Sequence, residues 1–256
     1  MKVLFVASEC TPIAKVGGLG DVIGSLPKAL KELGLDVRIV IPKYGVINER
    51  EYPSKLISSG IYVNGEKINI YQTFLSESKV ILYLLENERY FTENEIYFEK
   101  TAFVRSFKEI ERFLFFSKAV LEIFPYINWY PDILHCHDWH TAILPMLAKL
   151  QVQSSKFKVQ SLLTIHNLAN QGKWNANEIL NFLNLKGNEM KSLKVRDIEG
   201  NLNILEQGIF NADLLNTVSK TYRREILTKE YGEGLKGSLS KRKSDLYGIL
   251  DRKSVV

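Results

Sequence analysis

Cysteine is scarce in this sequence, and long apolar runs are missing. Two cysteines among 256 residues, Cys10 and Cys136, are too few for a disulfide framework, and their isolation is typical of a reducing compartment. No run approaches the roughly 18 apolar residues that a spanning helix needs, and the chain reaches polar Ser8 too early for a signal peptide. We therefore expect a cytoplasmic protein without a membrane partner.

Neither sign of charge dominates the composition. Lysine and arginine number 34 against 29 acidic residues, which leaves a net charge of only +5. Such a small surplus exerts little long-range attraction on a polyanion, so we expect no nucleic-acid partner. Hydrophobic residues make up 45% of the chain and charged residues 25%, which excludes a disordered or fibrous protein.

Short apolar runs alternate with longer segments of helical period. Residues 2–7 form an apolar run too short for a helix, and residues 36–41 form another. Between them, residues 21–33 carry apolar side chains at helical spacing, and Gly34 stands where helices commonly end. The first 42 residues therefore predict a right-handed strand, helix and parallel strand unit.

Between residues 44 and 86 the pattern changes from alternating strands and helices to successive strand-like segments. Asn64-Gly65, a dipeptide that favours tight hairpin turns, separates the apolar runs 61–63 and 68–70. This pattern predicts an antiparallel hairpin insertion, after which residues 80–85 rejoin the main sheet. A helix with one apolar side is predicted over residues 103–124.

The alternation continues to the end of the chain, without a repeat or a Gly/Ser-rich linker. Further strands are predicted at 132–136, 159–165 and 213–218, and further helices at 141–150 and 220–227. We predict one Rossmann-like domain over residues 1–250, an α/β fold with a doubly wound, mostly parallel sheet. Residues 240–256 carry little pattern to bury, and we expect them to fray unless another domain covers them.

A glycine-rich loop, residues 15–21, follows the first predicted strand. Ligands of open parallel sheets bind at the carboxyl ends of the strands, where this loop lies. Lys15 offers a positive charge, and Gly17 and Gly18 let backbone N–H groups approach an oxyanion, which indicates a phosphate-bearing ligand. A plain turn between strand and helix is the alternative. The dinucleotide fingerprint is missing because Ile23 stands in place of its third glycine.

Three of the four histidines lie within residues 135–140, which suggests a metal site. The first two point to one face of a strand while His140 starts the next helix, so the three converge only if the strand breaks. We therefore expect no metal and no cofactor. Asp138 can accept hydrogen bonds from sugar hydroxyls, with Trp139 covering an apolar face. The alternative is a helix N-cap, and Asp138 can fill both roles at once.

A third polar loop, residues 166–172, follows an apolar strand. Its first residue, His166, is placed to line a cleft at the ligand-binding end of the sheet. The alternative is a histidine that only hydrogen-bonds the neighbouring loop.

Four motifs together resemble the N-terminal half of bacterial glycogen synthases and plant starch synthases. They occupy residues 15–22, 137–142, 164–168, and 217–219 with 232–235, and their order and spacing match along nearly the whole chain. The resemblance implies half of a GT-B glycosyltransferase, in which a C-terminal domain absent from this chain holds most of the donor nucleotide. The implied reaction transfers glucose from ADP-glucose to the non-reducing 4-OH of an α-1,4-glucan, with retention of configuration.

The resemblance also implies roles for the residues of the first two loops. It places Lys15 and the backbone of Gly17 and Gly18 against the donor phosphates, and Asp138 against the sugar or the glucan acceptor. An oxocarbenium-like transition state needs positive charge on the departing diphosphate, which Lys15 supplies.

The third loop and one tyrosine complete the implied site. His166 hydrogen-bonds the transferred glucose and presents its main-chain carbonyl near the anomeric carbon, with Asn167 beside it. Tyr97 resembles a tyrosine that contacts the acceptor. The implied catalytic residues are thus His166, Asp138 and Lys15.

Two other functions remain open on the sequence. One is another GT-B transferase, such as a sucrose-type synthase, and the other is a free-standing glucan-binding module, which has no use for Lys15. Residues 246–250 resemble the hinge of the family, whereas residues 251–256 depart from its usual continuation and are candidates for a non-native tail.

Overall fold

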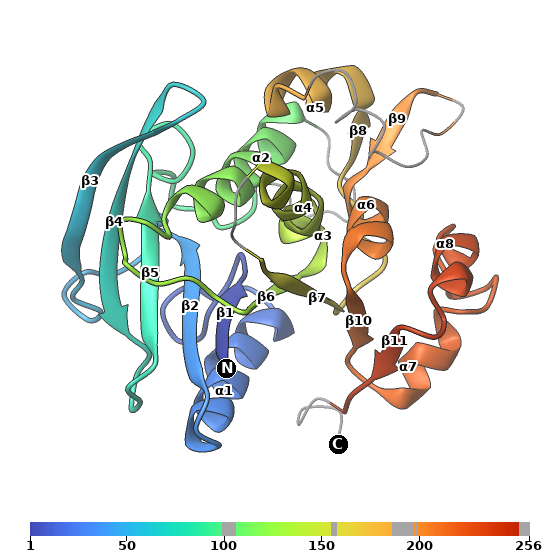
Figure 1. Ribbon diagram of the computed structural model, residues 1–256, viewed down its shortest axis with the longest axis horizontal. Coiled ribbons are helices and arrows are strands. Elements are labelled where there is room, and N and C mark those ends of the chain that lie inside the picture. Colours follow the sequence, from blue (N-terminus) through green and yellow to red (C-terminus); the bar gives the residue numbers. More distant parts are fainter. Residues whose placement is uncertain (99–105, 155–157, 186–196, 198, 251–256) are drawn as a thin grey trace. The chain divides into compact units, whose positions relative to one another are not determined.

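A computed structural model describes residues 1–98, 106–154, 158–185, 197 and 199–250 (Figure 1). The chain divides into two compact units, each described by itself. Unit 1 comprises Met1–Lys100 and Phe115–His135, and unit 2 comprises Thr101–Leu114 and Cys136–Val256. The predicted tail, residues 251–256, lies outside the described residues.

Unit 1 begins with the predicted parallel βαβ unit. Strand β1 (Lys2–Val6) pairs in parallel with β2 (Asp36–Pro42), and α1 (Gly18–Glu32) connects them. The helix starts three residues earlier than predicted. Its first turn lies against the loop after β1, where a Cβ on Gly20 would come within 3.0 Å of the Glu9 carboxylate, so glycine permits the close approach.

The hairpin insertion in unit 1 is confirmed. Strands β3 (Lys55–Val63) and β4 (Glu66–Phe74) are antiparallel, and Asn64 and Gly65 between them take φ values of 49° and 81°. Strand β5 (Ile81–Glu86) then pairs with β4 on one side and in parallel with β2 on the other, as predicted. The strand order in this unit is β1-β2-β5-β4-β3.

Helix α2 (Phe107–Glu122) and strand β6 (Ile133–His137) contribute to both units. The part of α2 in unit 1 carries Phe115 and Phe116, which are fully buried against Phe91. The α2 prediction covered residues 103–124, of which 103–105 lie outside the described residues.

Unit 2 contains a parallel set of three strands in the order β7-β10-β11. These are β7 (Gln160–Ile165), β10 (Leu214–Thr217) and β11 (Leu246–Gly248). Strands β8 (Lys173–Asn175) and β9 (Asn201–Asn203) form a separate antiparallel pair that the sequence did not predict.

The helices of unit 2 are short. They are α3 (Asp138–Thr141), α4 (Leu144–Ser154), α5 (Ala176–Leu183), α6 (Ile204–Asn211), α7 (Lys220–Glu225) and α8 (Lys236–Lys241). The single helix predicted at 141–150 is therefore wrong in its start, since the structure has two helices here, α3 ending at Thr141 and α4 starting at Leu144. Pro145 lies in the first turn of α4, where its missing N–H costs nothing.

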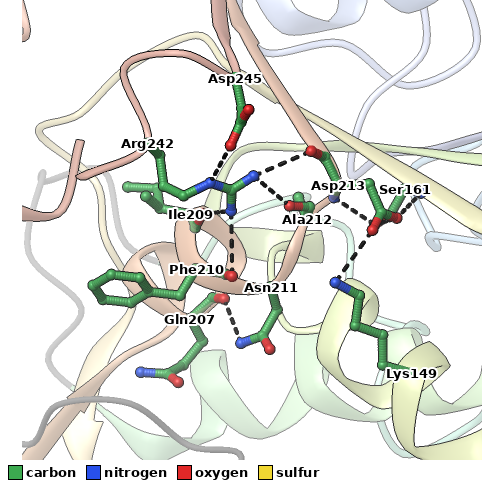
Figure 2. A network of polar contacts seen from close by, with 10 residues as sticks. All are labelled: Lys149, Ser161, Gln207, Ile209, Phe210, Asn211, Ala212, Asp213, Arg242 and Asp245. Atoms are coloured by element: carbon green, nitrogen blue, oxygen red, sulfur yellow. Dashed lines mark hydrogen bonds and ion pairs between the residues drawn. The ribbon is translucent and has the colours of Figure 1, made fainter. Parts of the chain in front are cut away.

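The prediction that residues 240–256 fray is wrong for residues 240–250. Leu246 of β11 is 1% exposed, and β11 pairs with β10. Figure 2 shows contacts that hold this segment: the Arg242 guanidinium donates to four backbone carbonyls at and beyond the C-terminal end of α6, at 2.7–3.2 Å, and to Asp245 at 2.8 Å. Arg242, which lies in the segment expected to fray, is thus an internal anchor.

The architecture confirms the predicted α/β class with a mostly parallel sheet and a hairpin insertion. Within the described ranges, no helix combines the length and apolarity that crossing a membrane requires. The segment that leads to the glycine-rich loop begins at the carboxyl end of β1, and the loop carrying His166 begins at the carboxyl end of β7.

Candidate active site

The glycine-rich loop of unit 1 carries an exposed ion pair. The Lys15 ammonium lies 2.7 Å from Oδ1 of Asp21, and the Lys15 side chain is 42% exposed. An ion pair this exposed contributes only about 0–1 kcal/mol, so Lys15 can leave Asp21 for an anionic ligand at little cost. A Cβ on Gly18 would meet no atom within 4 Å, so the chain leaves space beside this residue.

The backbone of the same loop is held from inside by Glu9. Oε2 of Glu9 accepts hydrogen bonds from the N–H groups of Val16 and Gly17, at 2.6 and 2.7 Å. The expectation that the Gly17 N–H faces the phosphate of a ligand therefore needs correction, because in this structure that N–H already donates to the Glu9 carboxylate. A Cβ on Gly18 would meet no atom within 4 Å, and the contact of its backbone with a phosphate stays a prediction.

Tyr97 belongs to the same cluster in unit 1. Its hydroxyl donates to Oε1 of Glu9 at 2.7 Å and lies 2.7 Å from the Ser8 hydroxyl. Burial and the neighbouring Glu9 carboxylate hold the pKa of Tyr97 well above its ordinary value, so the hydroxyl remains a donor. The structure thus joins two sequence-predicted features, Gly17 and Tyr97, through Glu9.

Glu9 is a residue that the sequence reasoning missed. It lies just beyond β1, eight positions before Gly17, and it is 3% exposed. A carboxylate directly after a buried strand and before a glycine-rich loop was a usable signal, because that position faces the amino end of the following helix.

In unit 2, Asp138 joins the end of β6 to the loop after β7. Its Oδ1 accepts hydrogen bonds from the backbone N–H groups of His166 at 2.7 Å and Asn167 at 3.3 Å. The N-cap alternative is wrong, because α3 begins at Asp138 itself and the cap position falls on His137. Asp138 has a φ of 53°, in the left-handed region, a strained conformation that often occurs at functional positions.

The imidazole of His166 lies against a second histidine. Nε2 of His166 is 3.0 Å from Nδ1 of His137, and the two ring centroids are 5.3 Å apart. His137 is fully buried, and Thr141 brackets its backbone by accepting from the N–H and donating to the carbonyl. His166 therefore does hydrogen-bond a neighbouring segment, at His137, as the alternative interpretation expected. Its contact with a ligand stays a prediction.

The rest of this loop is held by its own side chains and by α7. Asn167 is exposed, and its Oδ1 accepts from the N–H of Ala169 at 2.9 Å. The Tyr222 hydroxyl accepts from the N–H of Leu168 at 3.1 Å. The loop that follows β7 therefore has a defined backbone path on which His166 and Asn167 sit.

Trp139 does not offer an exposed apolar face, contrary to the expectation. It is 3% exposed, and its ring packs edge-on against Phe113 at 5.4 Å between centroids. Gly172 faces the same indole so closely that a Cβ there would lie 2.3 Å from Cε3. Trp139 is therefore a core residue of unit 2.

The remaining histidines are also buried. In unit 1, His135 packs against Phe5 with the ring centroids 4.5 Å apart. In unit 2, burial and the nearby Arg112 charge lower the pKa of His140 to about 3. Among the described residues, no group of three or more histidine, cysteine, aspartate or glutamate side chains could hold a metal ion.

The comparisons with known proteins cover nearly the whole chain. The starch synthase catalytic domain family matches residues 2–241. The glycogen synthase of Clostridium kluyveri is 41% identical over 98% of this chain and 52% of its own, and that of Anoxybacillus flavithermus is 39% identical over 98% and 51%. A solved structure, "Catalytic domain of Starch Synthase IV from Arabidopsis thaliana bound to ADP and acarbose", superposes with a TM-score of 0.85 at 29% identity, over 98% of this chain and 51% of that one.

The fold and the loops define an α/β protein with the ligand-binding architecture of open parallel sheets, matching one part of a GT-B catalytic domain. The chain spans about half the length of the curated relatives it matches. It belongs to the starch synthase catalytic domain family.

Proposed function

We propose that this chain supplies the acceptor-side half of a retaining hexosyltransferase of the glycogen or starch synthase type. The reaction transfers glucose from ADP-glucose to the non-reducing 4-OH of an α-1,4-glucan in the cytoplasm, and it requires a C-terminal GT-B domain beyond this chain. The observation that carries the proposal is the 98% coverage by glycogen synthases of which this chain spans only about half. The ADP and acarbose named with the starch synthase IV structure support the nucleotide-sugar donor and the glucan acceptor.

Residues 1–250 constitute the N-terminal domain in this proposal. Lys15 neutralises charge on the departing diphosphate, and the backbone at Gly18 approaches the same phosphates, while the N–H of Gly17 is held by Glu9. The exposed Lys15 pair with Asp21 supports this role, because the Lys15 ammonium reaches solvent and can exchange Asp21 for a phosphate at little cost.

In unit 2 the proposed contacts to sugar come from the loop after β7. His166 hydrogen-bonds the transferred glucose, and its main-chain carbonyl supplies a negative dipole near the anomeric carbon, with Asn167 adjacent. Asp138 positions that carbonyl, because its carboxylate holds the N–H groups of His166 and Asn167. Tyr97 of unit 1 contacts the acceptor glucan.

A fusion experiment tests the proposal. This chain is joined to the C-terminal half of the Clostridium kluyveri glycogen synthase, and glucose transfer from ADP-glucose or UDP-glucose to glycogen is measured. We expect the fusion to transfer glucose and the 256-residue chain alone to transfer a negligible amount. Steady turnover by the lone chain contradicts the two-domain requirement, and glucan binding without transfer by the fusion indicates the binding-module alternative.

Substitutions in the fusion test the roles of the residues. Lys15→Ala should lower kcat by about 100-fold or more, because one electrostatic partner of the transition state is lost. His166→Ala should retain more activity, since its backbone carbonyl survives the substitution. Lys31→Ala, in the last turn of α1, is the matched control and should leave kcat unchanged. A Lys15→Ala variant with a raised KM and an unchanged kcat contradicts the transition-state role.

A further inference from the structure

The Glu9 carboxylate is a buried junction between two parts of unit 1 that the proposed function assigns to different substrates. Oε2 accepts from the N–H groups of Val16 and Gly17, and Oε1 accepts from the Tyr97 hydroxyl. The loop belongs to the proposed donor side and Tyr97 to the acceptor side. A buried carboxylate is costly unless its oxygens are hydrogen-bonded, and here three short bonds of 2.6–2.7 Å offset that cost.

The tyrosine end of this junction is fixed by further bonds. The Tyr97 hydroxyl also lies 2.7 Å from the Ser8 hydroxyl, and the Ser8 carbonyl accepts from the buried Tyr44 hydroxyl at 2.9 Å. Because the Tyr97 proton goes to Glu9, the Ser8 hydroxyl donates to Tyr97. The orientation of the Tyr97 ring therefore depends on the position of the Glu9 carboxylate.

At its other end, Glu9 sets the orientation of the backbone of the glycine-rich loop. Glu9 turns two successive N–H groups of the loop inward, and the first turn of α1 packs directly on its side chain at Gly20. The open side of the loop is then the side at Gly18, where a Cβ would meet no atom within 4 Å. Removing the carboxylate frees the backbone that sets this orientation.

We propose that Glu9 is a positioning residue that holds the glycine-rich loop and Tyr97 in one arrangement, so that a change at either one disturbs the other. This inference rests on the proposed function for its effect on catalysis. Its structural part, the coupling of Tyr97 to the loop backbone, stands independently of that function.

Two substitutions of Glu9 distinguish a role in positioning from a role of its negative charge. In a Glu9→Gln variant the amide oxygen can accept both loop N–H groups, and the amide nitrogen can donate to the Tyr97 oxygen, whose proton then turns to Ser8. Glutamine therefore preserves the geometry without the charge. Glu9→Ala leaves the N–H groups of Val16 and Gly17 without their acceptor.

The structural test is amide hydrogen exchange by NMR on the 256-residue chain. We expect the amides of Val16 and Gly17 to exchange at least about tenfold faster in Glu9→Ala, and within about threefold of the wild type in Glu9→Gln. Tyr97→Phe should also speed their exchange, by about threefold or more, although Tyr97 does not touch either amide. Tyr83→Phe, which removes a buried hydroxyl bonded to Arg38 in the same unit, is the matched control and should not change their exchange.

Unchanged exchange at these amides in Tyr97→Phe overturns the coupling, even where Glu9→Ala fails to fold. The catalytic part is read in the fusion with the Clostridium kluyveri half. There we expect Glu9→Ala to lower kcat by about 30-fold or more and Glu9→Gln by less than about threefold. Equal losses of kcat in the two variants overturn the positioning role and indicate that the negative charge of Glu9 matters instead. Equal kcat in Glu9→Ala and the wild type shows that Glu9 has no role in catalysis. A wild-type fusion without activity refutes the proposed function alone, since the exchange measurements still decide the coupling.

Discussion

Replacing Arg242 with alanine should destabilise unit 2 by several kilocalories per mole. The guanidinium makes five hydrogen bonds, four to backbone carbonyls at the end of α6 and just before β10 and one to Asp245, and its side chain is only 16% exposed (Figure 2). The positive charge also lies at the negative end of the α6 dipole. These bonds tie the segment just before β11 to the end of α6, some thirty positions earlier in the chain.

The size of the loss follows from the kind of bonds involved. A hydrogen bond to a charged group contributes about 1.5–3 kcal/mol, but bonds that share one guanidinium are far from additive. Water can also reach part of the vacated site. We therefore expect Arg242→Ala to lower the free energy of unfolding by about 2–4 kcal/mol, and Arg242→Lys to lower it by roughly half as much, since an ammonium reaches fewer of the carbonyls.

Urea unfolding measures the effect, and amide exchange locates it. Lys243→Ala removes the same charge from an exposed neighbour and is the control, with an expected change within about 0.5 kcal/mol. The β11 amides should lose protection in Arg242→Ala before those of β7 do. If Arg242→Ala unfolds at the same urea concentration as Lys243→Ala, the guanidinium network does not anchor β11, and the reasoning is refuted.

Two further stability predictions follow from buried groups. Burial, followed by the Arg112 charge, lowers the pKa of His140 to about 3, so the unfolded chain takes up a proton near pH 6.5 that the folded chain refuses. The free energy of unfolding should therefore fall as the pH drops below about 6.5, by up to about 2 kcal/mol at pH 5. The urea midpoint of a His140→Gln variant should lack this part of the pH dependence. The same pH dependence in both proteins would exclude His140 as the source. Gly172→Ala should cost about 2–4 kcal/mol in urea unfolding, because the residue has a φ of +63° and its Cβ would lie 2.3 Å from the Trp139 ring. Gly34→Ala, at φ +86° with no atom within 4 Å, should cost only about 1 kcal/mol, and equal costs would rule out the Trp139 contact as the cause.

Local patterns in the sequence were sufficient to predict most regular elements of the fold. Apolar runs predicted β1, β2 and β7 to within two residues at each end, and Asn64-Gly65 predicted the hairpin turn. These elements depend on the spacing of apolar side chains and on turn conformations, which neighbouring residues determine. The short strands β8, β9 and β11 were missed, since three residues carry no periodicity and such strands form only where a partner backbone is present.

The candidate site was predicted as a set of loops, without the contacts inside them. The motifs led to Lys15, Asp138 and His166, and parallel strands place such loops at carboxyl ends. That Asp138 binds the backbone at His166 is a contact across 28 positions, and that Tyr97 meets Glu9 is one across 88. No local pattern encodes contacts of this kind.

The sequence by itself determined the α/β class, the hairpin insertion and the family, because periodicity, turn residues and motif order can all be read from the order of residues along the chain. Only the tertiary structure decided which polar groups face inward. It directed two loop N–H groups to Glu9, buried Trp139 against Phe113, and used Arg242 as an internal anchor instead of a surface charge. The physical reason is that a buried donor or charge must find a partner wherever the fold brings one within about 3 Å, and the spacing of residues along the chain does not specify that partner.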